Sequence, residues 1–362
     1  MAASSYTASN LLSQVQGQTM HVPPLDSLYS HWIQGVNPLV EEIRPLVEEL
    51  LVRYVPQKED LSHARASAYC LFAATWYPDC DLPRLQFVVI YSIFLFFWDD
   101  NIDREEGSCD RDLSYDITLG TQYRSEAKAY ANWHLGFEAK GCPEPQYQNP
   151  QLEMFGMAAK IFRRLADQDT LRRFRDEVFL YIDSCQREQE DRLSGKFPSA
   201  ESYWETRLGT SSVYTFCAFS PFILGLSFPK ALLDSQEMLD CWTEVNKNIV
   251  FENDLLSFKK EVADGATTTL IPVLMNEHCI SMNEAVALSV AGLAECCKRF
   301  DMAGAALRKR AMEFDTNVQN SVGRLIRCFE TMQSGCYNWS KKTDRYGVGP
   351  YRKEDGSLQF QL

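Results

Sequence analysis

Two groups of oxygen-bearing side chains in this 362-residue chain have the spacing of a metal-dependent site. The first is the stretch 99–103, with the sequence D-D-N-I-D, which closes the apolar segment 87–98. On a helix, Asp99 and Asp103 would share a face, because residues four apart are neighbours there. The helix dipole disfavours negative charge at a helix C-terminus, so these carboxylates need a cation to offset them.

The second group consists of Asn253, Ser257 and Glu261, which follow one another at intervals of four and would line one face of a helix. Asn and Ser are mediocre helix residues, because their side chains compete with the backbone for hydrogen bonds. A row of hard oxygen donors suits Mg²⁺, which prefers octahedral geometry and takes further ligands from water and substrate phosphate. The two groups together indicate a site for Mg²⁺ and a phosphorylated substrate.

The elements that must position these groups are predicted to be helices. The segments 171–195, 240–261 and 282–335 show helical periodicity, and no convincing alternating pattern of a strand separates them. We expect the last of these segments to form two helices, broken near 301–304. The prolines within 143–150 indicate a loop. These patterns predict an all-α protein, a bundle of roughly ten helices.

The composition allows one large domain with a deep core. Hydrophobic residues make up 45% of the chain and aromatic residues 12%, which is enough for a sizeable apolar cavity. We expect the domain to span 26–346, with a flexible N-terminal tail at 1–25 and a C-terminal tail at 347–362. The net charge of −13 argues against nucleic acid as a partner, because a phosphate backbone needs a basic surface. An acidic protein can still bind an anion through divalent cations.

The twelve cysteines are expected to be reduced core thiols. They are scattered without a C-x-x-C pair, and residues 1–24 lack the parts of a signal peptide. The longest apolar run, 87–98, is too short to span a bilayer, so we expect no membrane span. A cytoplasmic protein is the expectation, and the sequence leaves open whether it is a monomer or a homodimer.

The two acidic groups, in this order, resemble the metal-binding motifs of class I terpene cyclases of the fungal and bacterial type. The patterns are D-D-x-x-D at 99–103 and N-D-x-x-S-x-x-x-E at 253–261. The resemblance implies three Mg²⁺ ions: Asp99 bridges two of them, and the three donors of the second motif chelate the third. It also implies that Asp103 serves as a further ligand, directly or through water. Asp100 is implied to pair with a basic residue when the site closes.

Basic side chains should complete a site that holds three Mg²⁺ ions and a diphosphate. The resemblance implies an arginine 46 positions before Asn253, which is Arg207 in the stretch P-S-A-E-S-Y-W-E-T-R. It also gives phosphate-binding roles to Lys260 and to Arg345 and Tyr346, which end the stretch N-W-S-K-K-T-D-R-Y. The asparagine of that stretch directly precedes its tryptophan, which departs from the spacing of the family.

The resemblance implies a class I terpenoid synthase-like α-bundle with a central apolar active-site cavity. Loss of diphosphate leaves an allylic cation that must not meet water early, so the cavity must be apolar and closed. Aromatic faces can stabilise such a cation by ~1–2 kcal/mol each when desolvated, and Phe96 and Trp339 are the best candidates. Just after the implied arginine, Gly209 could supply a helix break. Thr210 and Ser211 are both possible donors of a backbone carbonyl to the substrate there.

The implied function is the Mg²⁺-dependent ionisation and cyclisation of an isoprenyl diphosphate. Farnesyl diphosphate is the expected substrate, because a one-domain chain with these motifs most resembles sesquiterpene-forming cyclases. Geranylgeranyl diphosphate is an alternative, since single-domain diterpene cyclases share the motifs. A chain-elongating prenyltransferase should carry a second Asp-Asp pair, and a class II cyclase a D-x-D-D motif, and the sequence has neither. A non-catalytic helical binding protein is the alternative from another class, and the complete set of metal donors argues against it.

Overall fold

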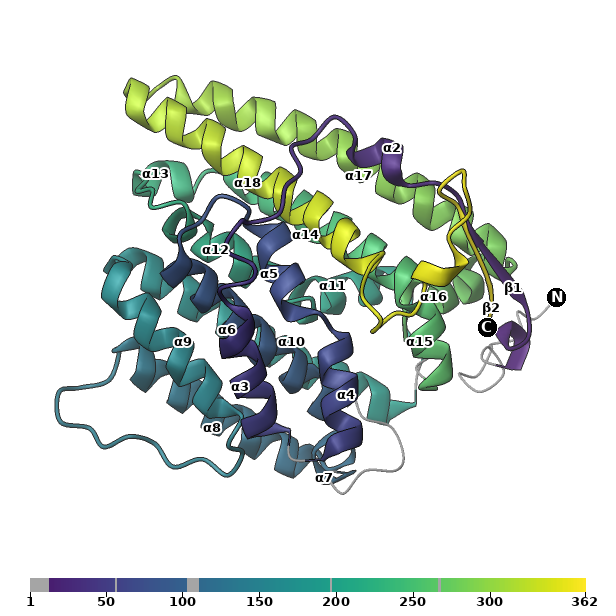
Figure 1. Ribbon diagram of the computed structural model, residues 1–362, viewed down its shortest axis with the longest axis horizontal. Coiled ribbons are helices and arrows are strands. Elements are labelled where there is room, and N and C mark those ends of the chain that lie inside the picture. The colour runs from purple at the N-terminus through teal and green to yellow at the C-terminus, as the bar shows by residue number, and fades with distance from the viewer. Residues whose placement is uncertain (1–12, 56, 103–110, 196, 266–267) are drawn as a thin grey trace.

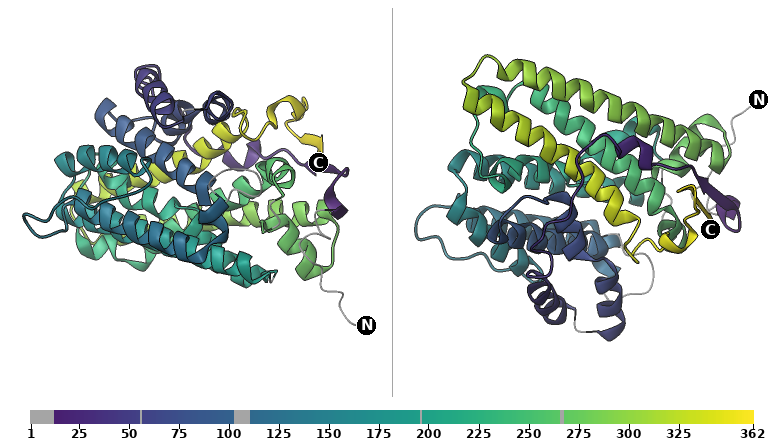
Figure 2. Two further views of the ribbon diagram at one scale, coloured as in Figure 1. Left: turned by 90° about the horizontal axis from the view of Figure 1, so that it is seen from below. Right: turned by 45° about the horizontal axis from the view of Figure 1, so that its top comes forward.

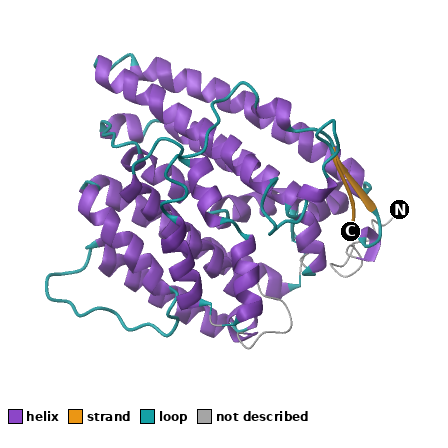
Figure 3. Cartoon of the chain, in the orientation of Figure 1, coloured by secondary structure: helices purple, strands orange, loops and turns teal. Residues whose placement is uncertain are grey.

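The structure, a computed structural model, describes residues 13–55, 57–102, 111–195, 197–265 and 268–362 (Figure 1). Within these residues, helices form nearly all of the regular structure, and two short strands lie beside the chain ends (Figure 3). The prediction of an all-α bundle is confirmed.

The long helices account for most of the chain, and short helical turns connect several of them. The helices of eight or more residues are α3 (Arg44–Tyr54), α4 (Lys58–Ala66), α5 (Tyr69–Trp76), α6 (Leu82–Ile102), α8 (Ile117–Leu135), α9 (Leu152–Leu165), α10 (Gln168–Ser194), α11 (Ala200–Thr210), α12 (Val213–Ile223), α14 (Gln236–Leu256), α16 (Leu270–His278), α17 (Met282–Ala311) and α18 (Thr316–Ser340). The shorter ones are α2 (Asp26–Tyr29), α7 (Arg111–Tyr115), α13 (Lys230–Leu233), α15 (Phe258–Ala263) and the 3₁₀ turn η1 (Gly349–Tyr351).

Helix α6 lies in the core and brings the first acidic group to one end of the bundle. It packs against α5 on one side and α9 on another. The stretch Leu82–Asp100 has the length and the mean hydropathy, 1.3, of a membrane span, but 67% of it is buried inside the bundle. Packing against neighbouring helices therefore accounts for its apolar character.

Helix α14, which carries the second acidic group, is enclosed by other helices. It packs against α17, α18 and α12, and α10 packs against α8, α11 and α12. The long pair α17 and α18 lies side by side along the upper edge of the molecule in Figure 1 and in the right-hand view of Figure 2. The packing of α6 and α14 against these neighbouring helices fixes the positions of their ends.

One predicted helix break was wrong. The expected break near 301–304 lies inside α17, and the chain turns instead at residues 312–315. Gly304 is buried within the helix, and a Cβ there would lie 3.4 Å from Ile326 of α18, which is an ordinary contact distance. The new helix starts at Asp315, whose carboxylate accepts a hydrogen bond from the backbone N–H of Val318 at 3.0 Å.

The two chain ends also differ from the expected tails. Strand β1 (Thr19–Val22) pairs with strand β2 (Leu358–Gln361) in an antiparallel ladder, with Met20 opposite Phe360. Both of these side chains are buried, so the ladder closes over part of the core. The expectation of tails without regular structure is therefore wrong for these segments, while the boundaries of the domain stay a prediction.

The cysteines that the structure describes are all free thiols. Nine of these eleven are buried, and only Cys142 and Cys279 are exposed. This arrangement agrees with thiols that pack as small apolar side chains.

Candidate active site

The two acidic groups lie at the same end of the bundle and act on each other's surroundings. Asp100 is at the C-terminal end of α6, and Lys260 is on α15, just beyond α14. Burial raises the pKa of Asp100, but Arg345 and then Lys260 lower it below its ordinary value. Lys260 directly precedes Glu261, and Asp100 directly follows Asp99. Because the charge of Lys260 lowers the pKa of Asp100, the two acidic groups face a common region.

The first group is only partly within the described residues. Asp99 is exposed at the end of α6, so its carboxylate is accessible from solvent. Asp103 lies outside the described residues, so its role as a metal ligand stays a prediction.

The second group keeps its spacing although the helix is interrupted. Helix α14 ends one residue before Ser257, and α15 begins one residue after it. The backbone N–H of Ser257 donates to the carbonyl of Asn253 at 2.8 Å, and that of Glu261 donates to the carbonyl of Ser257 at 3.0 Å. The Ser257 hydroxyl also donates to the Glu261 carboxylate. The three donors therefore lie in one row, as the sequence predicted.

The carboxylate of Glu261 is in an environment that a bound cation would stabilise. Its Oε2 atom is buried and has no hydrogen-bond partner in the described part of the chain. Burial, followed by repulsion from Asp254, raises the pKa of its carboxyl group to about 7. A cation at Oε2 would remove this penalty, so the residue fits a metal ligand. Among the described residues, no group of three or more His, Cys, Asp or Glu side chains is arranged to hold a metal ion.

Arg207 of α11 contacts the second group directly. Its Nη2 donates to Oδ1 of Asn253 at 2.8 Å and to Oδ1 of Asp254 at 3.2 Å. Asp254 is 1% exposed and also accepts from the Tyr203 hydroxyl and from the backbone N–H of Leu270 at 3.0 Å. A buried carboxylate with these donors fixes the guanidinium beside the predicted metal donors.

The role of Asp254 in holding Arg207 was missed from the sequence. A signal was present, since Tyr203 and Arg207 lie four residues apart on α11 and share a face. Two such groups on one face need a common acceptor, and Asp254 directly follows Asn253. Only the packing of α11 against α14 shows that they meet.

The two residues near the C-terminus approach both acidic groups. Arg345 donates to the two carboxylate oxygens of Asp100 at 2.7 and 3.2 Å, the pairing expected for that aspartate. Tyr346 accepts a hydrogen bond from Nδ2 of Asn253 at 2.6 Å. Lys260 instead pairs with Asp264 at 2.9 Å. The segment after α18 therefore bridges α6 and α14.

Aromatic side chains lie directly below these charges. Phe96 meets Phe72 and Trp339 edge to face, with ring centroids 5.6 and 5.7 Å apart. Trp339 is fully buried, and its ring nitrogen donates to the carbonyl of Ser67 at 2.8 Å, which fixes the ring. The Arg345 guanidinium lies 5.1 Å from the centre of the Phe96 ring. The two predicted aromatic candidates thus belong to one group beneath the charged end.

The helix break after Arg207 is placed differently from the expectation. Gly209 lies inside α11, and the break falls at Ser212, whose φ of 58° is left-handed. Gly209 is needed for another reason, because a Cβ there would lie 1.9 Å from the Oγ of Ser184 on α10. Ser211, at the break, donates to Oδ1 of Asn246 on α14 at 2.7 Å.

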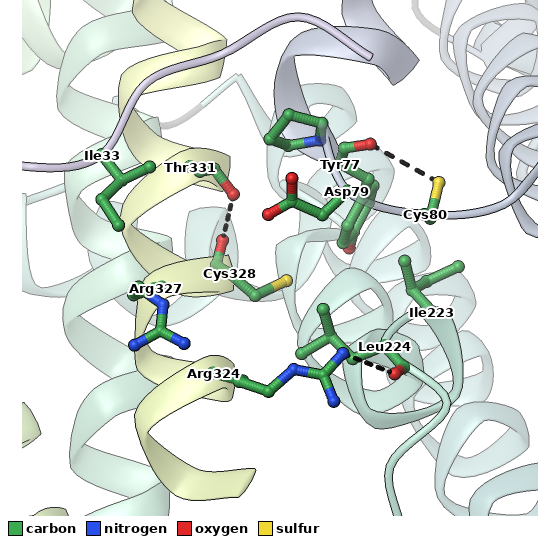
Figure 4. A pocket seen from close by; sticks show the side chains of 11 residues that line it. Ile33, Tyr77, Asp79, Cys80, Ile223, Leu224, Arg324, Arg327, Cys328 and Thr331 are labelled. Atoms are coloured by element: carbon green, nitrogen blue, oxygen red, sulfur yellow. Dashed lines mark hydrogen bonds between the residues drawn. The ribbon is translucent and has the colours of Figure 1, made fainter. Parts of the chain in front are cut away.

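A separate pocket lies at the other end of the bundle, away from the two acidic groups (Figure 4). It is lined by residues that precede α6, that end α12 and that belong to the middle of α18, including Asp79, Leu224, Arg324 and Cys328. Arg324 donates there to the carbonyl of Leu224 at 3.2 Å. None of the predicted metal or phosphate donors lines this pocket.

Comparisons with known proteins show the family of the chain. The family model described as terpene synthase family 2, C-terminal metal binding, matches residues 91–299. The sesquiterpene cyclase hepA of Aspergillus oryzae is 28% identical over 345 residues, which cover 94% of this chain and 92% of the relative. The (+)-T-muurolol synthase of Roseiflexus castenholzii, named as cyclising (2E,6E)-farnesyl diphosphate, is 26% identical, with 80% and 83% covered.

Solved structures show the same fold. The crystal structure of germacradien-4-ol synthase from Streptomyces citricolor superimposes with a TM-score of 0.73. The match covers 86% of this chain and 97% of that structure at 17% sequence identity.

Proposed function

The chain belongs to terpene synthase family 2, and we propose that it cyclises farnesyl diphosphate with the help of Mg²⁺. Membership of the family and the class I terpene synthase fold make it a terpene cyclase. The observation that carries the proposal is the row of Asn253, Ser257 and Glu261, with Arg207 bonded to its first member.

The choice of substrate rests on the relatives. One relative is named a sesquiterpene cyclase, and another is named for the cyclisation of farnesyl diphosphate. Geranylgeranyl diphosphate is the second candidate, because the same motifs serve longer substrates. We further propose a cytoplasmic enzyme, as a monomer or a homodimer.

The metal donors proposed here are Asp99, Asn253, Ser257 and Glu261, with Asp103 as a further ligand and three ions in all. Bound Mg²⁺ would supply Lewis-acid stabilisation of the departing diphosphate. Glu261 supports this assignment because its buried Oε2 lacks a partner among the described residues.

The basic residues would bind the diphosphate by exchanging partners. Arg207, Lys260 and Arg345 each pair with an aspartate of the same end of the bundle, and Tyr346 bonds to Asn253. A diphosphate offers more acceptor oxygens and more negative charge than any one of these aspartates, so the side chains can turn to it and concentrate positive charge on the leaving group. The aromatic group of Phe96 and Trp339 would then face the allylic cation and keep water from it.

The proposal is tested by measuring diphosphate release from geranyl, farnesyl and geranylgeranyl diphosphates with Mg²⁺ and with chelator. We expect the highest kcat/KM with farnesyl diphosphate and no release after chelation. Asn253→Ala should abolish release while leaving the helical circular-dichroism signal intact. Release that persists in chelator, or in this variant, would remove the metal row from the mechanism.

A further inference from the structure

The hydroxyl of Tyr91, on α6, has no evident packing purpose. The residue is fully buried, and its oxygen makes no hydrogen bond of ordinary length and angle within the described residues. Its ring packs against Phe174 and Phe216, with centroids 5.1 and 5.7 Å away. Phenylalanine would fill the same space without leaving a polar atom desolvated, so stability alone does not explain a tyrosine here.

Two other hydroxyls lie beside that of Tyr91. Ser212 and Thr215, at the start of α12, are both buried. Burial raises the pKa of the Tyr91 phenol, and these two hydroxyls lie close enough to offset part of that rise by weak hydrogen bonding. Their own hydroxyls are 3.2 Å apart, and that of Thr215 also donates to the carbonyl of Ser212 at 2.7 Å. We call Tyr91, Ser212 and Thr215 the hydroxyl cluster.

The hydroxyl cluster lies below the metal-binding end on two sides. Tyr91, Leu95 and Asp99 follow at intervals of four along α6, so Tyr91 is about 12 Å, or slightly more than two turns, below Asp99. On α14, Asn246 lies seven residues before Asn253. It accepts a hydrogen bond from Ser211, at the helix break next to Ser212 of the hydroxyl cluster. A chain whose diphosphate is held at the metal end would therefore extend its distal part toward this level.

Aromatic rings connect the two levels. Phe96 packs on Phe72, Phe72 packs on Phe216, and Phe216 packs on Tyr91, with centroids 5.6 to 6.0 Å apart. The hydroxyl cluster is thus the polar point at the lower end of an otherwise aromatic wall.

We propose that Tyr91 is a specificity-determining residue, whose hydroxyl stabilises positive charge on the distal part of the bound isoprenyl chain. This inference rests on the proposed function. Burial raises the pKa of the phenol, so the group stays neutral, takes no proton and acts through its oxygen dipole. By favouring charge at one position, it selects among the possible cyclisation paths.

The test compares Tyr91→Phe with wild type in two measurements on farnesyl diphosphate. Gas chromatography–mass spectrometry should show the ratio of main to minor products changed by about five- to tenfold. Diphosphate release should stay close to wild type, because Tyr91 is remote from the leaving group. Thr215→Val should change the profile as well, and Thr215→Ser, which keeps the hydroxyl, should preserve it.

Tyr123→Phe is the matched control, because it removes a buried tyrosine hydroxyl that bonds to Asn149 and lies against Trp98 instead. Its product profile should equal that of wild type. A melting temperature of Tyr91→Phe equal to or above wild type would exclude misfolding. An unchanged profile in both Tyr91→Phe and Thr215→Val would overturn the inference alone. Absence of diphosphate release from the wild type would instead overturn the proposed function, and this inference with it.

Discussion

At the residue scale, Glu261 shows how a site can be unstable without its ligand. Its carboxylate is buried beside Asp254, and one of its oxygens has no partner among the described residues. Burying a carboxylate without a full set of partners lowers the stability of the fold. Such a residue is expected where a ligand, here a metal ion, binds it. The nearby Arg207 relieves it only in part, because its guanidinium is bonded to Asn253 and Asp254.

Glu261→Gln should therefore separate activity from stability. We expect kcat/KM to fall by about 100-fold or more, because a metal donor loses its charge. The melting temperature should stay equal or rise, since a buried charge is removed. Diphosphate release and thermal unfolding check both results, with the exposed Glu205→Gln on α11 as control. Full activity of Glu261→Gln would exclude it as a metal donor.

Phe96 allows a second test at this scale. Its ring lies between Trp339 and the Arg345 guanidinium, below the charged end. Phe96→Ala should change the product distribution more than the rate of diphosphate release, because the ring would contact the cation rather than the leaving group. Product analysis beside a release assay distinguishes the two effects. Equal products from variant and wild type would leave Phe96 with a packing role only.

At the element scale, the position of Arg207 depends on how closely α11 approaches α10. A Cβ on Gly209 would lie 1.9 Å from the Oγ and 2.5 Å from the Cβ of Ser184. Nothing but the absence of a side chain at Gly209 allows this approach. The separation of these helices therefore sets where the guanidinium meets Asp254.

Gly209→Ala should destabilise the protein by about 1–3 kcal/mol and slow diphosphate release, because the two helices must separate. Ser184→Gly in the same chain removes both clashing atoms and should restore much of the activity. Gly335→Ala is the contrast, since its Cβ would lie 2.3 Å from the backbone oxygen of Thr75, which no substitution removes. Denaturant unfolding and release assays measure these effects. Failure of Ser184→Gly to rescue would place the defect elsewhere.

Ion pairs of Asp26 join the N-terminal segment to the end of α18 and to the C-terminal segment. Asp26, at the start of α2, pairs with Lys341 at 2.8 Å and with Arg352 at 2.9 Å. Burial raises the pKa of Asp26, but these two cations lower it below its ordinary value. The contact holds the segment that leads to Arg345 and Tyr346.

A lowered folded-state pKa gives this contact a definite pH dependence. Its contribution is present above the unfolded pKa of Asp26, about 3.9, and is lost as the pH falls through the folded value. Asp26→Asn should therefore lower the melting temperature at pH 7 by only about 1–3 °C, since the carboxylate is 42% exposed. The difference should vanish well below pH 4. A difference that is constant from pH 7 to pH 3 would contradict this account.

At the scale of the whole molecule, the helical periodicity of the sequence predicted the bundle, and the four-residue spacing predicted the row at Asn253. Those signals are local, so they can be read without knowing the fold. The partner of Arg207, the pairing of the two chain ends and the setting of Tyr91 arise from packing between distant segments. The turn at 312–315 was missed because Gly304, a residue type that often breaks helices, lies inside α17 here.

The most direct test of the account is gas chromatography–mass spectrometry of the organic extract after incubation of the purified protein with farnesyl diphosphate and Mg²⁺. The account predicts a cyclic fifteen-carbon hydrocarbon or alcohol that disappears when chelator is added. Recovery of unchanged substrate, or of acyclic alcohols alone, from folded protein with Mg²⁺ present would contradict it.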